Sequence, residues 1–322
     1  MRVIECQNLP HQAEPGVAYR LKPMPRGLAF YAERVDRNVG WVTAAEQEIL
    51  RCSTVAVAGC GGMGGVAAEL LLRMGIGEIR VADPELFDVS NIHRQIASGL
   101  DTLGTSKALA TARRLRAIAD DTTLAVYPQG VTPETVESFV RGADLVLDEV
   151  EAWAVFPRVV LHRESRDQGV DVINCNSIGA GTRLFLFTPD SDTMEQCLKL
   201  SHEKALAFHE SMLTGTATSD AKRRVGKTVI RGLLPELPEY MWRDSGMSTE
   251  LNLKRRLLDE GKAMILASNP YGAASFMVTH AVFHLLRHSG VARDIVRPVP
   301  MPGYLYRDDL LGSMKVCRAR WY

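Results

Sequence analysis

The sequence predicts an α/β fold: a doubly wound, mostly parallel sheet with a helical insertion and C-terminal closing strands. Short apolar runs rich in β-branched residues, such as 53–59 and 143–150, alternate with longer segments of helical spacing. Strands that alternate with helices indicate βαβ units, whose right-handed crossovers produce a parallel sheet. A glycine-rich turn follows the first of these strands, which is typical of folds that bind a ligand at the carboxyl ends of their strands.

The individual elements follow from hydrophobic periodicity and from turn residues. Strands are expected at 53–59, 78–83, 123–129, 143–150, 170–177 and 183–190, the last without an assigned neighbour. Helices are expected at 44–51, 66–75, 107–119, 133–142, 154–168 and 269–290. The tail, 300–322, is expected to form closing strands.

The chain is expected to have two parts. Residues 1–30 are proline-rich, are predicted to be irregular, and are interpreted as an extension that serves substrate recognition or dimer formation. Residues 31–322 are expected to form the main folded domain, with the glycine-rich turn. Between about 190 and 265 the strand pattern disappears, and helical spacing at 192–213 and 249–266 predicts a helical insertion.

Composition excludes several classes of protein. Lys+Arg and Asp+Glu both number 38, so a nucleic-acid partner is not expected. No apolar stretch approaches the roughly 20 residues of a membrane span, which predicts a cytoplasmic protein without a membrane partner. The six cysteines include no CxxC pair, so neither structural zinc nor disulfides are expected.

The turn at 59–64, GCGGMG, predicts a nucleotide site of the Rossmann-like kind. Gly59, Gly61, Gly62 and Gly64 allow backbone N–H groups to approach phosphate oxygens at a helix N-terminus. Asp83 ends the next strand, where an acidic side chain accepts hydrogen bonds from ribose hydroxyls. This pattern fits NAD as well as ATP, so an NAD-dependent oxidoreductase remains an alternative.

The residues that follow favour ATP. Asn91, Arg94 and Lys107 come after the second strand, and Asp148 ends a later strand. A hydride-transferring enzyme has no use for such a set around its phosphates, whereas cleavage between the α- and β-phosphates of a triphosphate needs it. In such a reaction Arg94 and Lys107 can neutralise charge on pyrophosphate, Asn91 can hold a phosphate or a ribose, and Asp148 can carry Mg²⁺.

These motifs resemble the ubiquitin-activating-enzyme-like superfamily that includes ThiF, MoeB and HesA. The matching segments are RNVGWVTAAEQ at 37–47, GCGGMG at 59–64, GIGEIRVADPELFDVSNIHRQ at 75–95, GTSK at 104–107 and LVLD at 145–148. The resemblance implies adenylation of a carboxylate with Mg-ATP within a homodimer.

The resemblance also implies roles for further residues. Arg37 matches an arginine that reaches into the partner subunit's site, with nearby Arg34 as a possible substitute, and Gln95 is expected to support the phosphate shell. Glu85 stands where the family has a second aspartate after the second strand, which is expected to alter ribose or metal geometry. Glu149 and Glu151 are interpreted as solvated loop carboxylates rather than a second acid pair.

The acceptor of the activated carboxylate is left open by departures from the family. Two CxxC pairs that bind zinc in sulfur-carrier enzymes are missing, and Cys197 is a possible thiol nucleophile or a relic of the first pair. The preferred substrate is therefore a peptide or small carboxylate, followed by amide formation or cyclisation. A tRNA threonylcarbamoyladenosine dehydratase-like enzyme and a sulfur-carrier-activating enzyme are the alternatives within the superfamily.

Overall fold

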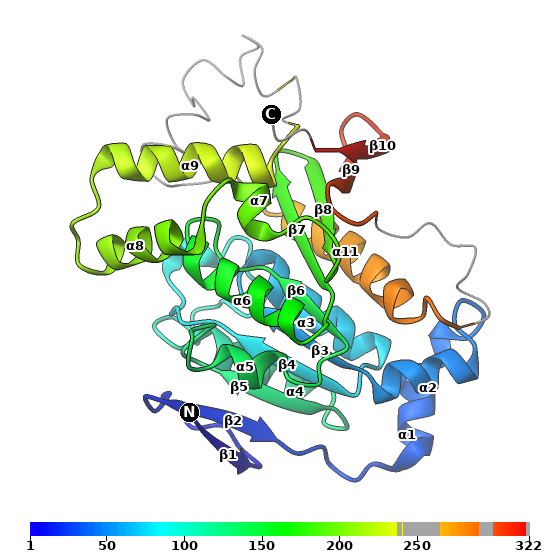
Figure 1. The fold of residues 1–322 in the computed structure, drawn as a ribbon. Helices are drawn as coiled ribbons and strands as arrows, with labels where there is room; N and C mark the ends of the chain where they lie inside the picture. Colours follow the sequence, from blue (N-terminus) through cyan, green and yellow to red (C-terminus); the bar gives the residue numbers. More distant parts are fainter. Residues whose placement is uncertain (237–239, 241–264, 290–298, 320–322) are drawn as a thin grey trace.

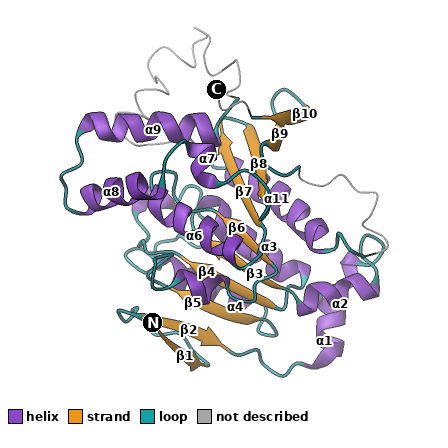
Figure 2. Ribbon diagram, viewed as in Figure 1, coloured by secondary structure: helices purple, strands orange, loops and turns teal. Residues whose placement is uncertain are grey.

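The computed structural model describes residues 1–236, 240, 265–289 and 299–319. Ten strands form one sheet in the order β1-β2-β5-β4-β3-β6-β7-β8-β9-β10, with helices on both faces (Figures 1 and 2). The bounds of the strands are β1 Arg2–Cys6, β2 Val17–Leu21, β3 Thr54–Ala58, β4 Glu78–Ala82, β5 Thr123–Tyr127, β6 Leu145–Asp148, β7 Val172–Ile178, β8 Gly181–Phe187, β9 Gly303–Asp308 and β10 Ser313–Arg318. The predicted α/β fold is confirmed.

The centre of the sheet is parallel and doubly wound. From β3 the chain runs outward through β4 to β5, then returns to β6 on the other side of β3 and continues to β7. The direction of winding therefore changes between β3 and β6. In open α/β sheets, ligands bind outside the carboxyl ends of the strands at such a point.

Two layers of helices cover the sheet, as the alternation of side chains along each strand requires. On β6, for example, Leu145 and Leu147 pack into one apolar core and Val146 into the other. One layer holds α2 Ala44–Cys52, α3 Gly62–Met74, α4 Lys107–Ile118 and α11 Asn269–Leu285. The other holds α5 Val136–Val140, α6 Val155–Asp167, α7 Met194–Leu198, α8 His202–Leu213 and α9 Ser219–Leu233.

The N-terminal segment departs from its predicted irregularity. Strands β1 and β2 pair in parallel with each other, and β2 pairs antiparallel with β5, so the segment extends the sheet at one edge. Pairing between residues about a hundred positions apart determines these strands, and local periodicity does not report it. Helix α1 (Gly27–Arg34) and the 3-10 helix η1 (Asp36–Asn38) connect this edge to α2.

The second half contains the expected helical insertion and closing strands. Helices α7, α8 and α9 occupy 194–233, and the predicted helical stretch at 249–266 lies mostly outside the described residues. Strand β8 finds its neighbours in β7 and β9, antiparallel to both. No helix of the described chain is long and apolar enough to cross a membrane.

Candidate active site

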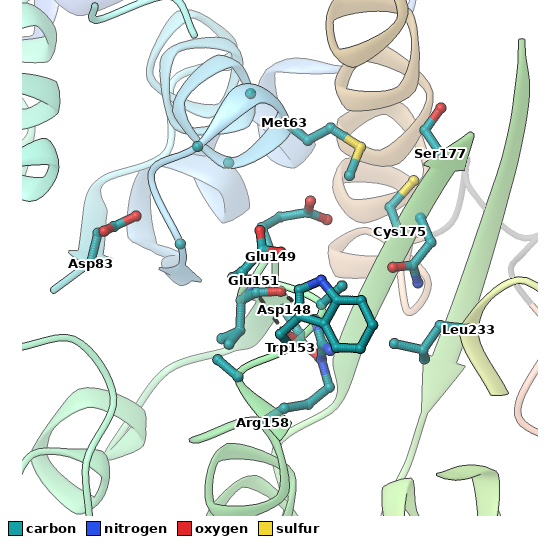
Figure 3. A pocket seen from close by; sticks show the side chains of 18 of the residues that line it. Met63, Asp83, Asp148, Glu149, Glu151, Trp153, Arg158, Cys175, Ser177 and Leu233 are labelled. Atoms are coloured by element: carbon teal, nitrogen blue, oxygen red, sulfur yellow. Dashed lines mark hydrogen bonds and ion pairs between the residues drawn. The ribbon is translucent and has the colours of Figure 1, made fainter. Parts of the chain in front are cut away.

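A cavity of about 270 Å³ opens at the point where the winding changes (Figure 3). The turn after β3, the residues after β4 and β6, helix α4 and helix α9 all contribute to its wall. Of the predicted site residues, those that line it are Gly59, Gly61, Gly62, Gly64, Asp83, Glu85, Arg94, Gln95, Lys107 and Asp148. The structure therefore brings most of the predicted set together around one space.

The glycines of the turn have two different roles. A Cβ at Gly64 would lie 1.9 Å from the carbonyl oxygen of Gly59, and one at Gly59, where φ is +104°, would lie 2.1 Å from the carbonyl oxygen of Glu149. These two glycines let α3 and the loop after β6 approach the strand. At Gly61, the N-cap of α3, an added Cβ meets only Gln95 Nε2, at 3.9 Å. This side of the turn is open, and it presents a helix N-terminus to the cavity.

Asp83 ends β4 with its carboxylate held by the turn. Its Oδ2 accepts a hydrogen bond from the backbone N–H of Cys60 at 2.7 Å, and its Oδ1 accepts one from Glu85 N–H at 2.8 Å. Burial raises the pKa of Asp83 to about 6, against the opposing effect of these two hydrogen bonds and of the charge of Lys107. The remaining lone pairs of both oxygens are available to hydroxyl donors.

The predicted phosphate ligands Lys107 and Arg94 both line the same cavity. The side chain of Lys107, at the first position of α4, is only 6% exposed, and its Nζ lies 2.5 Å from Glu85 Oε2. Arg94 is half-buried and donates from Nη1 to the carbonyl oxygen of Ser90 at 3.0 Å. Gln95 is buried, and its Oε1 has no hydrogen-bond partner. A buried donor or acceptor without a partner is costly, so Gln95 fits a bound polar ligand.

Asp148 is held more tightly than a solvated metal ligand would be. It is fully buried; its Oδ2 contacts Arg158 Nε at 2.8 Å and His162 Nε2 at 2.9 Å, and its Oδ1 accepts from Val150 N–H at 3.1 Å. Burial alone would raise the pKa of Asp148, but the charges and hydrogen bonds of Arg158 and His162 hold it below its ordinary value. Both of its oxygens are therefore already engaged inside the protein.

Three predicted residues lie apart from the described lining of the cavity. The side chain of Asn91 is buried and caps η2 (Val89–Asn91) through Asp88. Arg37 is exposed on η1, whereas its alternative, Arg34, pairs with Asp121 at 3.0 Å. Cys197 is buried in α7, and burial strongly raises the pKa of its thiol.

The interpretation of Glu149 as a solvated loop carboxylate is wrong. Glu149 is half-buried beside the glycine turn, and its enclosed Oε1 has no hydrogen-bond partner. Burial, and then the charge of Asp148, raise its pKa well above the ordinary value. Its position directly after the buried strand β6 was the available indication in the sequence.

Trp153 and the apolar wall of α9 were also missed, because no motif marks them. Trp153 lies near the middle of the cavity and Leu233 at its far side from Asp83 (Figure 3). Only the packing of the insertion against the loop after β6 brings them to one site.

The family model described as the ThiF family matches residues 35–297. The chain belongs to the ThiF family. The expected membership of the ThiF/MoeB-like superfamily is thereby confirmed.

A sulfur carrier protein adenylyltransferase of Thermus thermophilus is 34% identical over 102 residues, which cover 32% of this chain and 38% of that protein. A tRNA threonylcarbamoyladenosine dehydratase of Bacillus subtilis is 33% identical over 137 residues, which cover 42% and 52%. The chain thus matches about two fifths to half of the length of these relatives.

Solved structures show the same fold. PaaA has a TM-score of 0.60 at 16% identity, covering 92% of this ThiF-family chain and 86% of PaaA. The E. coli enzyme MccB, solved with ATP, has a TM-score of 0.59 at 15% identity, covering 89% and 70%. MccB has also been solved in complex with N-formylated MccA.

Proposed function

We propose that this ThiF-family protein is an ATP-dependent adenylyltransferase that activates a substrate carboxylate. The observation that carries the proposal is the convergence of the α3 N-terminus, Arg94, Gln95 and Lys107 on one cavity beside the buried Asp83. This set offers hydroxyl acceptors for a ribose and donors and cations for a triphosphate. Membership of the ThiF family and the likeness to MccB, solved with ATP, support the same function.

In the proposed reaction, an oxygen of the substrate carboxylate attacks the α-phosphorus of ATP. The bond between the α-phosphorus and the bridging oxygen breaks, and pyrophosphate leaves with the electron pair. Lys107 and Arg94 stabilise the negative charge that develops on pyrophosphate, because both are held close to the open side of the turn. A second nucleophile then takes the acyl group and releases AMP.

Magnesium is part of the proposal, and the residues of the cavity fit it. Glu85 and Glu151 line the cavity, and the charge of Glu85 contributes to a raised pKa of Glu151, after desolvation. Two carboxylates that face one space suit Mg²⁺, which uses one or two protein carboxylates together with substrate phosphates. Asp148 was the predicted ligand; because both of its oxygens are engaged, it would have to exchange a present partner to bind the metal.

We further propose a homodimer in which Arg37 acts on the partner's nucleotide. Within one chain Arg37 does not line the cavity, and the neighbouring side chains Val39 and Trp41 are 73% and 81% exposed. Exposed apolar side chains beside an unused arginine suit an interface with a second copy. A cytoplasmic location and a peptide substrate complete the proposal, the latter supported by the MccB–MccA complex.

The test is ATP–pyrophosphate exchange by the purified protein with pools of peptides, small carboxylates, small ubiquitin-like proteins and tRNA. We expect one pool to stimulate exchange. Absence of ATP binding would refute the adenylation proposal.

A mixture of Arg37→Ala and Asp148→Ala subunits tests the trans role of the arginine. The mixed dimers should regain exchange if Arg37 acts on the partner's site, because one composite site would then be intact. Failure to regain it would refute the trans role.

A further inference from the structure

The cavity continues past the glycine turn to an end that the nucleotide residues do not line. There the wall consists of apolar side chains of α9 and of the chain just after it, with Trp153 opposite. The members from this stretch are Val229, Ile230, Leu233 and Leu234. In Figure 3, Asp83 and Leu233 lie on opposite sides of Trp153. We call this end the α9 end of the cavity.

The distribution of charge separates the two ends. The lining cations Arg94, Lys107 and Arg158 come from the loop after β4, from α4 and from α6, and Arg158 is paired with Asp148. None of the described lining residues of α9 is charged. The described residues of α9 that line the cavity therefore offer no partner to a charged group, and a charge that loses its water without a partner is destabilising.

Three polar residues from the loop after β6 and from β7 line the same cavity as the α9 end. These are Glu149, whose Oε1 has no hydrogen-bond partner, and Asn176 and Ser177 of β7. A substrate whose carboxylate reaches the glycine turn would thus have its adjoining side chain directed to the α9 end.

We propose that the α9 end is an acyl subsite, which selects peptides whose reacting carboxylate is carried by a C-terminal residue with an apolar side chain. This rests on the adenylation proposed above and names the substrate class of that site. Ile230 and Leu234 are half-buried and determine the specificity through contact with the side chain. Selection follows because an apolar side chain gains by burial there, whereas a charged one loses its hydration.

The experiment uses twenty hexapeptide pools, each with one fixed C-terminal residue and five mixed positions that exclude Asp and Glu. In all but the two pools with a C-terminal Asp or Glu, the terminal carboxylate is then the only one present. ATP–pyrophosphate exchange is measured with each pool, and binding of a non-hydrolysable ATP analogue is measured separately. We expect pools ending in Leu, Ile, Val, Met or Phe to exceed those ending in Asp, Glu, Lys or Arg at least about tenfold in kcat/KM.

A substitution in α9 tests whether this helix determines the preference for the C-terminal side chain. Ile230→Lys should shift the preference toward pools ending in Asp or Glu by at least about tenfold, with unchanged binding of the ATP analogue. Leu213→Lys is the matched control, because Leu213 is 74% exposed on α8, does not line the cavity and gains the same charge. The control should keep the wild-type profile.

The outcomes are distinct. Preference for charged C-termini, an unchanged profile in a folded Ile230→Lys protein, or silence of all pools with the ATP analogue still bound would each overturn the acyl subsite. Loss of ATP binding by the wild-type protein would instead refute the proposed function itself. If Ile230→Lys fails to fold, the preference of the wild-type protein among the peptide pools still tests the acyl subsite.

Discussion

Removing either partner of the Lys107–Glu85 ion pair should affect stability differently, because the two side chains differ in exposure. Lys107 is 6% exposed and Glu85 is 54% exposed. Lys107→Met leaves a carboxylate that remains in contact with water, so no unpaired charge is buried. Glu85→Gln leaves an ammonium enclosed with a weaker acceptor beside it and with the ring of Phe87 at 5.9 Å.

The sizes of the two effects follow from this asymmetry. Breaking a fully buried pair costs about 3–5 kcal/mol, but here one partner is half exposed, so we expect Glu85→Gln to cost about 1–2 kcal/mol. Lys107→Met should cost less than about 1 kcal/mol, since a hydrophobic side chain of similar length replaces the buried ammonium. At about 2 °C per kcal/mol for a chain of this size, Tm should fall by about 2–4 °C in Glu85→Gln and by less than about 2 °C in Lys107→Met.

The two substitutions should rank differently in their effects on ATP–pyrophosphate exchange than in their effects on stability. Lys107→Met removes a charge that stabilises the departing pyrophosphate, so ATP–pyrophosphate exchange should fall about 10²–10³-fold, equivalent to about 2.7–4 kcal/mol of barrier. Thermal melts without nucleotide and exchange assays on the same preparations measure both effects. A larger fall in Tm for Lys107→Met than for Glu85→Gln, or unimpaired exchange in Lys107→Met, would refute the reasoning.

Three further predictions follow from buried groups. The pKa of Asp83, raised to about 6 by burial, implies protonation below that pH, so affinity for a non-hydrolysable ATP analogue should fall about tenfold between pH 7.5 and 5, and Asp83→Asn should remove this dependence; calorimetric titration checks it. Gly64→Ala places a Cβ 1.9 Å from Gly59 O and should abolish ATP binding, and retained affinity would contradict the close approach. Arg158→Met leaves the carboxylate of Asp148 buried without its guanidinium and should cost about 3–5 kcal/mol in urea unfolding, whereas an unchanged midpoint would show that His162 suffices.

Much of the candidate site could be predicted because neighbouring residues determine it. The glycine turn lies between a strand and a helix that local periodicity identifies. Asp83 directly follows β4 and Asp148 ends β6, and these two strands flank β3 in the sheet. The carboxyl ends of parallel strands meet at one edge of a sheet, so polar residues at these positions come together whatever the loops do. Asn91 lies in the 3-10 turn η2 and not at a strand end, and its side chain caps its own turn instead of lining the cavity.

Other features depend on contacts between distant segments. Strand β2 finds its partner in β5, more than a hundred residues later, so the N-terminal segment gave no local sign that it joins the sheet. The burial of Glu149 and the pairing of Asp148 with Arg158 depend on how the loop after β6 folds back onto α6 and the glycine turn. A carboxylate in such a loop is solvated or enclosed according to its neighbours, which its own position does not reveal.

The sequence by itself therefore determined the α/β architecture, the family and most of the predicted residues that line the cavity, because periodicity and glycine spacing act over a few residues. Only the tertiary structure decided which carboxylates are enclosed and paired, and which apolar side chains line the cavity beyond the glycine turn. Helix α9, about 170 residues after the turn, supplies that cover through its apolar face. Burial depends on every segment that packs around a side chain, and hence on the complete fold.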